Sequence, residues 1–188
     1  MVSPDLDRRF RDAAASAGLL DVAYDFAETP IGDVLVAATP RGLCRISYYG
    51  EEEVVARLAA QYGPRVLRSP KPVDPARRQL DEYFDGRRTD FDLELDHDVP
   101  DFYRQVLGEL ARVPFGETTT YGTLAKRVNH PTAARAVGTV MNRNPIPIVL
   151  PCHRVIGANG SLVGYAGGLD VKRKLLALEG ALPLQLET

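Results

Sequence analysis

The chain of 188 residues is long enough for one ordinary domain or two small ones. Hydrophobic residues make up 45% of it and charged residues 26%, which is typical of a globular protein. No apolar run in the sequence is long enough to cross a bilayer. The formal net charge of −2 is unevenly distributed: residues 1–114 hold 15 Lys and Arg against 21 Asp and Glu, whereas residues 115–180 hold 8 against 3. A basic second half suits a polyanionic partner, although on charge alone an uneven solvated surface is the better explanation.

The two cysteines, Cys44 and Cys152, are too few to form a disulfide framework. No Cys-x-x-Cys pair is present. The chain has only two cysteines and three histidines, so nearly all of them would have to meet at one place to bind zinc. The first residues show neither a basic start nor an apolar segment behind it, which argues against a signal peptide. We therefore expect a cytoplasmic protein with reduced thiols, no metal and no membrane segment.

The first half of the chain predicts a small antiparallel sheet with helices packed on it. Its β-rich runs are separated by Pro- and Gly-containing turns. The acidic stretch 96–100 predicts a linker, which divides the chain into an N-terminal α/β domain of residues 1–95 and a C-terminal domain of residues 96–188. The predicted elements are, in order, a helix over 4–17, strands over 22–28, 33–39 and 42–49, helices over 51–62 and 74–85 (with Asp74 as the cap of the latter), and a strand over 91–95.

The second half is mainly helical, so the predicted fold class is α+β. Its expected helices cover 102–113, 121–128, 133–142 and 170–178. Residues 129–131 (Asn-His-Pro) predict a tight turn, after which Thr132 is expected to cap the third of these helices. Two short helices joined by such a turn make a candidate helix-turn-helix, a motif that binds DNA.

The helix predicted over 133–142 has almost no bulk in its first turns. Ala133, Ala134, Ala136 and Gly138 are small, and Arg135 is the one long side chain among them. Small side chains allow close approach to a partner, and a single guanidinium could then insert beside the stacked bases of a duplex. From this helix alone, an Ala-rich helix packed against its own core, with Arg135 solvated, is the better explanation.

The strongest chemical signal is the stretch 151–155, Pro-Cys-His-Arg-Val. A cysteine beside a base is how a protein makes a sulfur nucleophile, because the thiolate reacts and the thiol does not. Pro145 and Pro147 impose extended geometry on the residues before them, which predicts a stiff segment that holds Cys152 in a fixed place. An inert buried cysteine is the less favoured alternative.

Neighbouring side chains diverge in an extended chain, so His153 is expected to act on Cys152 through a water molecule. An imidazole base needs an orienting partner on its other nitrogen, and Glu179, at the end of the last predicted helix, could fold back to supply it. An ordinary exposed glutamate is the alternative for Glu179. The Gly-rich residues 164–168 predict a flexible loop that could close over a flat ligand with Tyr165 as a wall, or simply connect two elements.

Together, and in their order along the chain, these motifs closely resemble those of the O6-alkylguanine-DNA alkyltransferases, also called methylated-DNA–protein-cysteine methyltransferases. The resemblance rests on Pro-Cys-His-Arg-Val at 151–155, Asn-Pro at 144–145, Arg-Ala-Val-Gly at 135–138 and Tyr-Ala-Gly-Gly at 165–168. It spans about residues 102–180. Residues 20–95 resemble the family's N-terminal domain, which is ribonuclease-H-like, only in length and strand–helix order.

The resemblance implies a DNA repair protein that acts once per molecule. Cys152 would attack the alkyl carbon on O6 of a guanine in double-stranded DNA, docked by its minor groove, and would keep the alkyl group as a stable thioether without any cofactor. The nucleotide must first flip out of the stack, at a cost of roughly a few kcal/mol. O6-methylguanine is the expected substrate and O4-alkylthymine a further one. The resemblance implies a monomer, with cooperative binding on DNA left open.

The resemblance also implies roles for individual residues. The implied catalytic residues are Cys152 as acceptor, His153 as water-mediated base, Glu179 as its orienting partner, Asn144 as a brace for the turn and Tyr121 as proton donor to the leaving guanine. The implied DNA-binding residues are Arg135, which fills the gap left by the flipped nucleotide, and its neighbours Ala136, Ala133 and Thr132. The implied lining of the base pocket is Tyr165, the backbone of Val155, Ala166 and Met141.

Two features depart from many relatives. Ala166 stands where many carry a serine, which removes one possible hydrogen bond to the guanine oxygen and leaves the alkyl-group preference open. The first half lacks the cysteines that form a zinc site in some relatives, so none is expected here.

Three other functions stay open at this point. A lesion-binding protein would recognise the alkylated base without consuming the thiol. A redox-responsive regulator would oxidise Cys152 and thereby alter DNA binding. A cysteine hydrolase would use Cys152, His153 and Glu179 as a triad and turn over an ester substrate.

Overall fold

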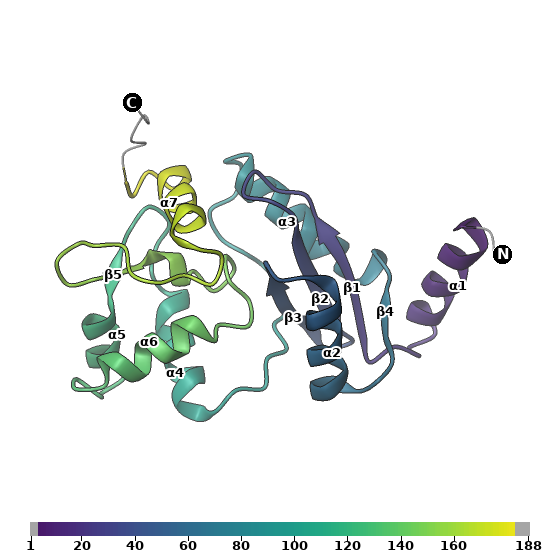
Figure 1. Cartoon of the computed structure of the whole chain (residues 1–188), viewed down its shortest axis with the longest axis horizontal. Coiled ribbons are helices and arrows are strands. Elements are labelled where there is room, and N and C mark those ends of the chain that lie inside the picture. Colours follow the sequence, from purple (N-terminus) through teal and green to yellow (C-terminus); the bar gives the residue numbers. More distant parts are fainter. Residues whose placement is uncertain (1–3, 183–188) are drawn as a thin grey trace. The chain divides into compact units, whose positions relative to one another are not determined.

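A computed structural model of the chain divides into two compact units, Met1–His97 and Asp98–Thr188, of which residues 4–182 are described. The elements of the first unit are α1 (Pro4–Ser16), β1 (Val22–Ala27), β2 (Val34–Thr39), β3 (Gly42–Ser47), α2 (Glu51–Tyr62), β4 (Val66–Arg68), the 3-10 helix η1 (Lys71–Val73) and α3 (Asp74–Phe84) (Figure 1). The elements of the second unit are α4 (Asp101–Ala111), β5 (Thr119–Thr120), α5 (Tyr121–Arg127), α6 (Ala134–Asn142), the 3-10 helix η2 (Cys152–Arg154), β6 (Val155–Ile156) and α7 (Leu169–Leu178).

The first unit is built on a four-stranded sheet with the order β3-β2-β1-β4. The hairpin neighbours β1, β2 and β3 pair antiparallel, and β4 adds to β1 in parallel after the chain has crossed over through α2. β1 and β2 are buried along nearly their whole length, because side chains on one face of the sheet pack against Val54 and Leu58 of α2 while α3 contacts β1.

α2 matches its predicted bounds because its end signals are strong. Glutamates fill its first turn, where their charge complements the helix dipole. Gly63 ends the helix with a φ of +125°, a conformation that an L side chain rarely adopts.

Two predictions for the first unit are wrong in detail, and one strand was not predicted. Residues 91–95 form no strand and contribute only an isolated bridge between Leu43 and Leu95. Asp74 is the first helical residue of α3 rather than its cap, and Val73 takes the cap position. β4 was not predicted, because its three residues are too few to show an alternating pattern.

The second unit is mainly helical, so the chain as a whole is α+β as predicted. α4, α5 and α6 contact one another, and α7 contacts η2 (Figure 1). β5 and β6 form a two-stranded parallel ladder that pairs Thr119 with Val155. This ladder fixes the chain just after η2 against the chain just before α5.

The threonine cap that the sequence predicts for the second short helix is wrong, and the structure has one at the first short helix instead. The hydroxyl of Thr120 accepts a hydrogen bond from the backbone N–H of Thr123 at 3.1 Å and so caps α5. Thr132 caps nothing, because Ala133 occupies the cap position of α6 and no side-chain cap bond is found there. The Thr132 hydroxyl therefore stays exposed ahead of the helix.

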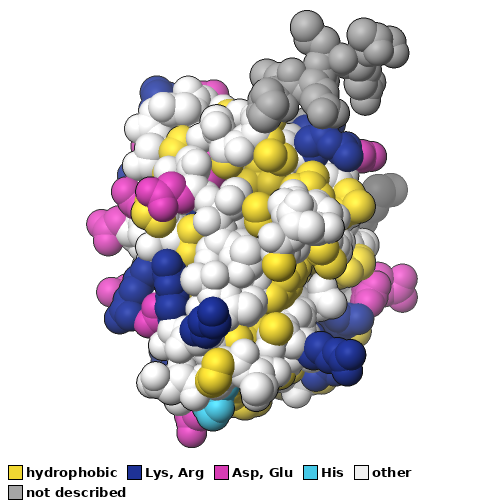
Figure 2. Space-filling view, turned by 90° about the vertical axis from the view of Figure 1, so that its left-hand side faces the viewer, with side chains coloured by type: hydrophobic (Ala, Val, Ile, Leu, Met, Phe, Trp, Pro, Cys, Tyr) yellow, Lys and Arg dark blue, Asp and Glu magenta, His cyan; other side chains and the backbone are white. Residues whose placement is uncertain are grey.

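The structure adds two observations about the surface. Among residues 4–182, no helix combines the length and apolar character that a membrane crossing requires. Figure 2 looks onto the side of the molecule where Arg135 lies, and on this side Lys and Arg side chains flank a strip of neutral and hydrophobic ones.

Candidate active site

Cys152 lies at the start of η2, directly behind a tight turn rather than at the end of a stiff extended segment. The N–H of Leu150 donates to the carbonyl of Ile146 at 2.9 Å, which folds the apolar run 146–150 back on itself. The prediction of extended chain was wrong here because Pro147 restricts only its own φ and the residue before it, leaving Ile148 free to turn the chain. The 3-10 turn also places Cys152 and His153 in helical rather than extended geometry.

Asn144 braces this turn from both sides. Its amide Nδ2 donates to the carbonyl of Leu150 at 2.7 Å, and its Oδ1 accepts from the backbone N–H of Ile146 at 3.1 Å. Ile148 carries the strain of the turn with a φ of +76°, a rare conformation for a β-branched residue. Such a conformation costs about 1–3 kcal/mol and persists where surrounding structure enforces it. Full burial of the Ile148 side chain, worth about 1.5–3 kcal/mol, offsets that cost.

Glu179 reaches back from the end of α7 to His153, as the sequence suggested. Its Oε1 lies 2.8 Å from His153 Nε2, and both side chains are buried. An ionised carboxylate only accepts hydrogen bonds, so Nε2 carries the proton. Arg154 binds the same carboxylate through Nε at 2.8 Å and Nη2 at 2.9 Å.

The opposite nitrogen of the imidazole is available for chemistry. His153 Nδ1 is buried and has no hydrogen-bond partner among residues 4–182. Burial lowers the pKa of His153, although its hydrogen bond to Glu179 and the charge of that carboxylate act in the other direction. The ring is therefore neutral near pH 7, with Nε2–H toward Glu179 and a lone pair on Nδ1.

The thiol of Cys152 is protonated near neutral pH. Burial raises the pKa of Cys152 to about 11, against the opposing effects of a hydrogen bond with Asn144 and the charge of Lys172. A thiol in this state needs a base to become a nucleophile. The structure supplies a neutral imidazole on the next residue.

Lys172 is a site residue that the sequence analysis missed. It is fully buried, and its ammonium donates to the carbonyls of Val155 at 2.6 Å and Val163 at 2.7 Å. Burial lowers its pKa to about 8, so it is still mainly charged at pH 7. The available signal was its spacing: Lys172 lies seven residues before Glu179 on the same stripe of α7 as the buried Leu175 and Leu176.

The loop before α7 lies over this cluster. Tyr165 places its ring perpendicular to the imidazole of His153, with centroids 6.4 Å apart, and Ala166 beside it is half-buried. The hydroxyl of Tyr121 is 3.5 Å from the carbonyl of Val163, which joins the start of α5 to the same loop. Burial raises the pKa of Tyr121, so its hydroxyl keeps its proton.

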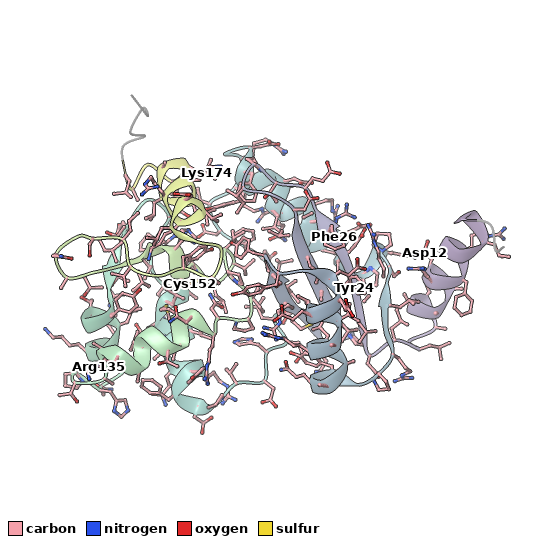
Figure 3. All side chains as sticks on the ribbon, viewed as in Figure 1. Asp12, Tyr24, Phe26, Arg135, Cys152 and Lys174 are labelled. Carbon is pink, nitrogen blue, oxygen red and sulfur yellow. The ribbon has the colours of Figure 1, made fainter. Side chains whose placement is uncertain are left out.

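The helix-turn-helix carries the residues predicted to meet DNA. Ala133 directly precedes α6 and is half-buried, whereas Arg135 and Ala136 in the first turn of α6 are exposed. Arg135 is the long side chain at this exposed start of the helix (Figure 3). No ion pair of the Arg135 guanidinium is found within residues 4–182. A Cβ on Gly138 would lie 3.9 Å from the ring of Tyr121, so α6 passes close to the tyrosine.

The structure thus brings part of the predicted set together. Hydrogen bonds join Asn144 to Cys152 and His153 to Glu179, and the charge of Lys172 acts on both Cys152 and His153. Val155 and Met141 are buried, and the carbonyl of Met141 accepts from Asn144 N–H at 3.3 Å. Within the described residues, no three His, Cys, Asp or Glu side chains are grouped so that they could hold a metal ion.

Fold and site together define a two-unit α+β protein with a helix-turn-helix beside a buried Cys-His-Glu cluster. Residues 101–181 match the DNA-binding domain of 6-O-methylguanine DNA methyltransferase, and residues 22–97 match the ribonuclease-like domain of the same family. The chain belongs to the methylated-DNA–protein-cysteine methyltransferase family.

Individual relatives agree with this assignment. The methylated-DNA–protein-cysteine methyltransferase of Methanosarcina acetivorans is 43% identical over 159 residues, which cover 84% of this chain and 98% of that protein. The protein of the same name from Mycolicibacterium paratuberculosis is 42% identical over 158 residues, or 84% of this chain and 92% of that one. The crystal structure of Mycobacterium tuberculosis OGT in complex with DNA matches with a TM-score of 0.75 at 38% identity, covering 85% of this chain and 93% of that chain.

Proposed function

We propose that this protein repairs DNA by taking the alkyl group of O6-alkylguanine onto Cys152, irreversibly and once per molecule. The observation that carries the proposal is the buried cluster in which a neutral His153, held by Glu179, follows Cys152 in the domain that matches the family's DNA-binding domain. The relatives' names and the DNA complex of the tuberculosis protein support DNA as substrate.

The proposed reaction begins with the thiol proton of Cys152. This proton passes through a water molecule to His153 Nδ1, which has the lone pair to accept it. The Nε2–H of His153 stays hydrogen-bonded to Glu179 throughout. The sulfur then bonds to the alkyl carbon as the bond from that carbon to O6 breaks. The electron pair of the broken bond stays on the guanine, which takes up a proton and leaves as an ordinary base.

The other site residues hold this geometry or serve the base. Tyr121 keeps its proton and is suited to donate it to the departing guanine. Lys172 fixes the Val155 carbonyl, which is suited to read the base edge, and ties it to the loop that carries Tyr165 and Ala166. Asn144 keeps the turn before Cys152 in place. These assignments rest on the hydrogen bonds and burial described above together with the family resemblance.

We propose that the lesion is reached by base flipping from the minor-groove side. A guanine inside the stack cannot meet a buried sulfur, and extrusion costs roughly a few kcal/mol, less for a weakly paired lesion. Arg135 would fill the gap that the base leaves, and Thr132, Ala133 and Ala136 would let α6 approach the backbone closely. O4-alkylthymine is a further proposed substrate. A cytoplasmic location and a monomeric state stay predictions.

The test is a titration of the protein against a duplex that contains one O6-methylguanine. With DNA in excess, the guanine restored should equal the amount of protein and then stop. Cys152→Ser should restore none, and the matched variant Cys44→Ala should keep its one equivalent. Binding without conversion would indicate a lesion-binding protein instead, and conversion beyond one equivalent would indicate true turnover.

A further inference from the structure

Arg154 is the one residue of the Cys-His-Arg turn to which the proposed reaction gives no role. Its side chain is only 6% exposed. Besides its two bonds to Glu179, its Nη1 donates to the carbonyl of Val113 at 2.6 Å, and its guanidinium lies 5.8 Å from the ring centre of Phe115. These contacts fix the guanidinium in one orientation, so its geometry toward Glu179 is as well defined as that of His153.

The carboxylate of Glu179 carries one negative charge, and both Arg154 and His153 lie where they could balance it. Its Oε1 accepts from both His153 Nε2 and Arg154 Nη2, and its Oε2 accepts from Arg154 Nε and, at 3.4 Å, from the N–H of Gly116. Arg cannot be deprotonated in a protein, and its planar fork matches a carboxylate through two parallel bonds. Arg154 therefore supplies the balancing cation, and the buried charge is neutralised without a proton on His153.

We propose that Arg154 is a positioning residue that keeps His153 a neutral base. Arg154 balances the negative charge of Glu179, so this charge no longer favours a second proton on the imidazole. Oε1 of Glu179 can still accept the hydrogen bond from Nε2–H of His153. Nδ1 is then left with the lone pair that must receive the thiol proton. The catalytic part of this inference rests on the proposed function, whereas the protonation state of His153 does not.

The other charged and titratable groups near the imidazole agree with this assignment. Lys172, from α7, is positive and disfavours a second positive charge. Cys152 is a neutral thiol near pH 7, and Tyr165 presents its ring at right angles to the imidazole. Glu179 is the group that favours the charged ring, so the state of His153 depends on how completely Arg154 balances that carboxylate.

The first test uses the unmodified protein. Nitrogen-15 NMR of the imidazole at pH 7 distinguishes imidazolium from the two neutral tautomers and needs no DNA. We expect His153 to be neutral with its proton on Nε2. An imidazolium, or a proton on Nδ1, at pH 7 would overturn the proposal.

Two substitutions at Arg154 then separate charge from geometry. Arg154→Gln removes the balancing cation, so the pKa of His153 should rise by about one to three units, the usual effect of an opposite charge left nearby. Arg154→Lys keeps the charge and should leave His153 neutral, with a slower reaction from the lost second bond. The double variant Arg154→Gln with Glu179→Gln removes both charges and should return His153 to the neutral state.

The same variants give a kinetic readout that a merely structural role would not produce. Because only neutral His153 can accept the thiol proton, the acid limb of the single-turnover rate should move to higher pH in Arg154→Gln and stay in place in Arg154→Lys. A rate loss in Arg154→Gln with an unmoved acid limb and an unchanged NMR state would refute the proposal. If Arg154→Gln does not fold, the spectra of the unmodified protein and of Arg154→Lys still test the proposal, because an imidazolium in either of them would contradict it. Absence of methyl transfer in the unmodified protein would instead refute the proposed function.

Discussion

At the scale of single residues, the site is unusual for the charge it buries. Lys172 on α7 and Glu179 directly after α7 are both buried, and buried ionised side chains are rare unless paired or hydrogen-bonded. Each has its partners: Lys172 meets two carbonyls, and Glu179 meets Arg154 and His153. Their electrostatic effects on the thiol and the imidazole are strong because little water screens them.

Replacement of Lys172 by Met should affect both stability and reaction. Two carbonyls would lose their ammonium donor, which costs about 1–3 kcal/mol for each buried group left unpaired. The thiol pKa of Cys152 should rise further, because the charge that lowers it is gone. Urea unfolding measures the first effect, and the pH dependence of thiol alkylation measures the second. Unchanged thiol reactivity across pH would contradict the assigned role of Lys172.

Cys44 provides a pH test of the fold. Burial raises its pKa to about 12 from an ordinary value of 9.0, so between those values the native protein holds a proton that the unfolded chain has lost. This group's contribution to stability is therefore complete below pH 9 and falls as pH rises toward 12. Cys44→Ala should destabilise the protein at pH 7, and its deficit relative to the parent should shrink by about 1–2 kcal/mol at pH 10.5. Denaturant unfolding at both pH values would reveal a constant deficit if the thiol were not protected in this way.

At the scale of elements, the pair α5 and α6 presents DNA with a smooth surface and one long side chain. The small residues of α6 leave room for a backbone, and Gly138 lets the ring of Tyr121 lie against the helix. Arg135 extends from the exposed side of this surface and is free of ion pairs among the described residues, so its placement serves no other visible contact. A guanidinium inserted into the duplex should affect the reaction only when the lesion has to be flipped out of a base stack.

Arg135→Ala should therefore slow methyl transfer from duplex DNA while leaving transfer from the free base O6-methylguanine unchanged. The free base needs no flipping, so it separates extrusion from chemistry. Arg143→Ala, an exposed arginine at the end of the same helix, is the matched control and should alter duplex affinity at most. Rapid-mixing assays at saturating protein measure the rates. Equal loss on both substrates would place Arg135 in the chemistry instead.

The elements also show what a sequence alone can predict. α2 was predicted to the residue because its acidic first turn and Gly63 are local signals. The turn at Ile148 was not, because a positive φ at a buried β-branched residue is imposed by Asn144 and the surrounding core rather than by local preference. Glu179 was predicted as the orienting partner of His153 from its place at the end of the last helix, whereas Lys172 was missed because its role depends on which way α7 faces.

At the scale of the whole molecule, every candidate site residue belongs to the second unit. That unit also carries exposed cations, among them Lys126, Arg127 and Arg143. The first unit has a well-packed sheet, yet none of its residues enters the proposed chemistry. Binding to duplex should accordingly weaken as salt is raised, with little dependence on sequence around the lesion, because phosphate contacts dominate such surfaces.

The most direct measurement is the location of the methyl group after the protein has met a duplex carrying O6-methylguanine. Intact-mass analysis followed by peptide mapping should show one methyl in place of one hydrogen, confined to the peptide that contains Cys152. The Cys44 peptide should be unchanged, because that thiol is buried and its pKa is about 12. A methyl on any other residue, or repaired DNA beside an unmodified protein, would contradict the account.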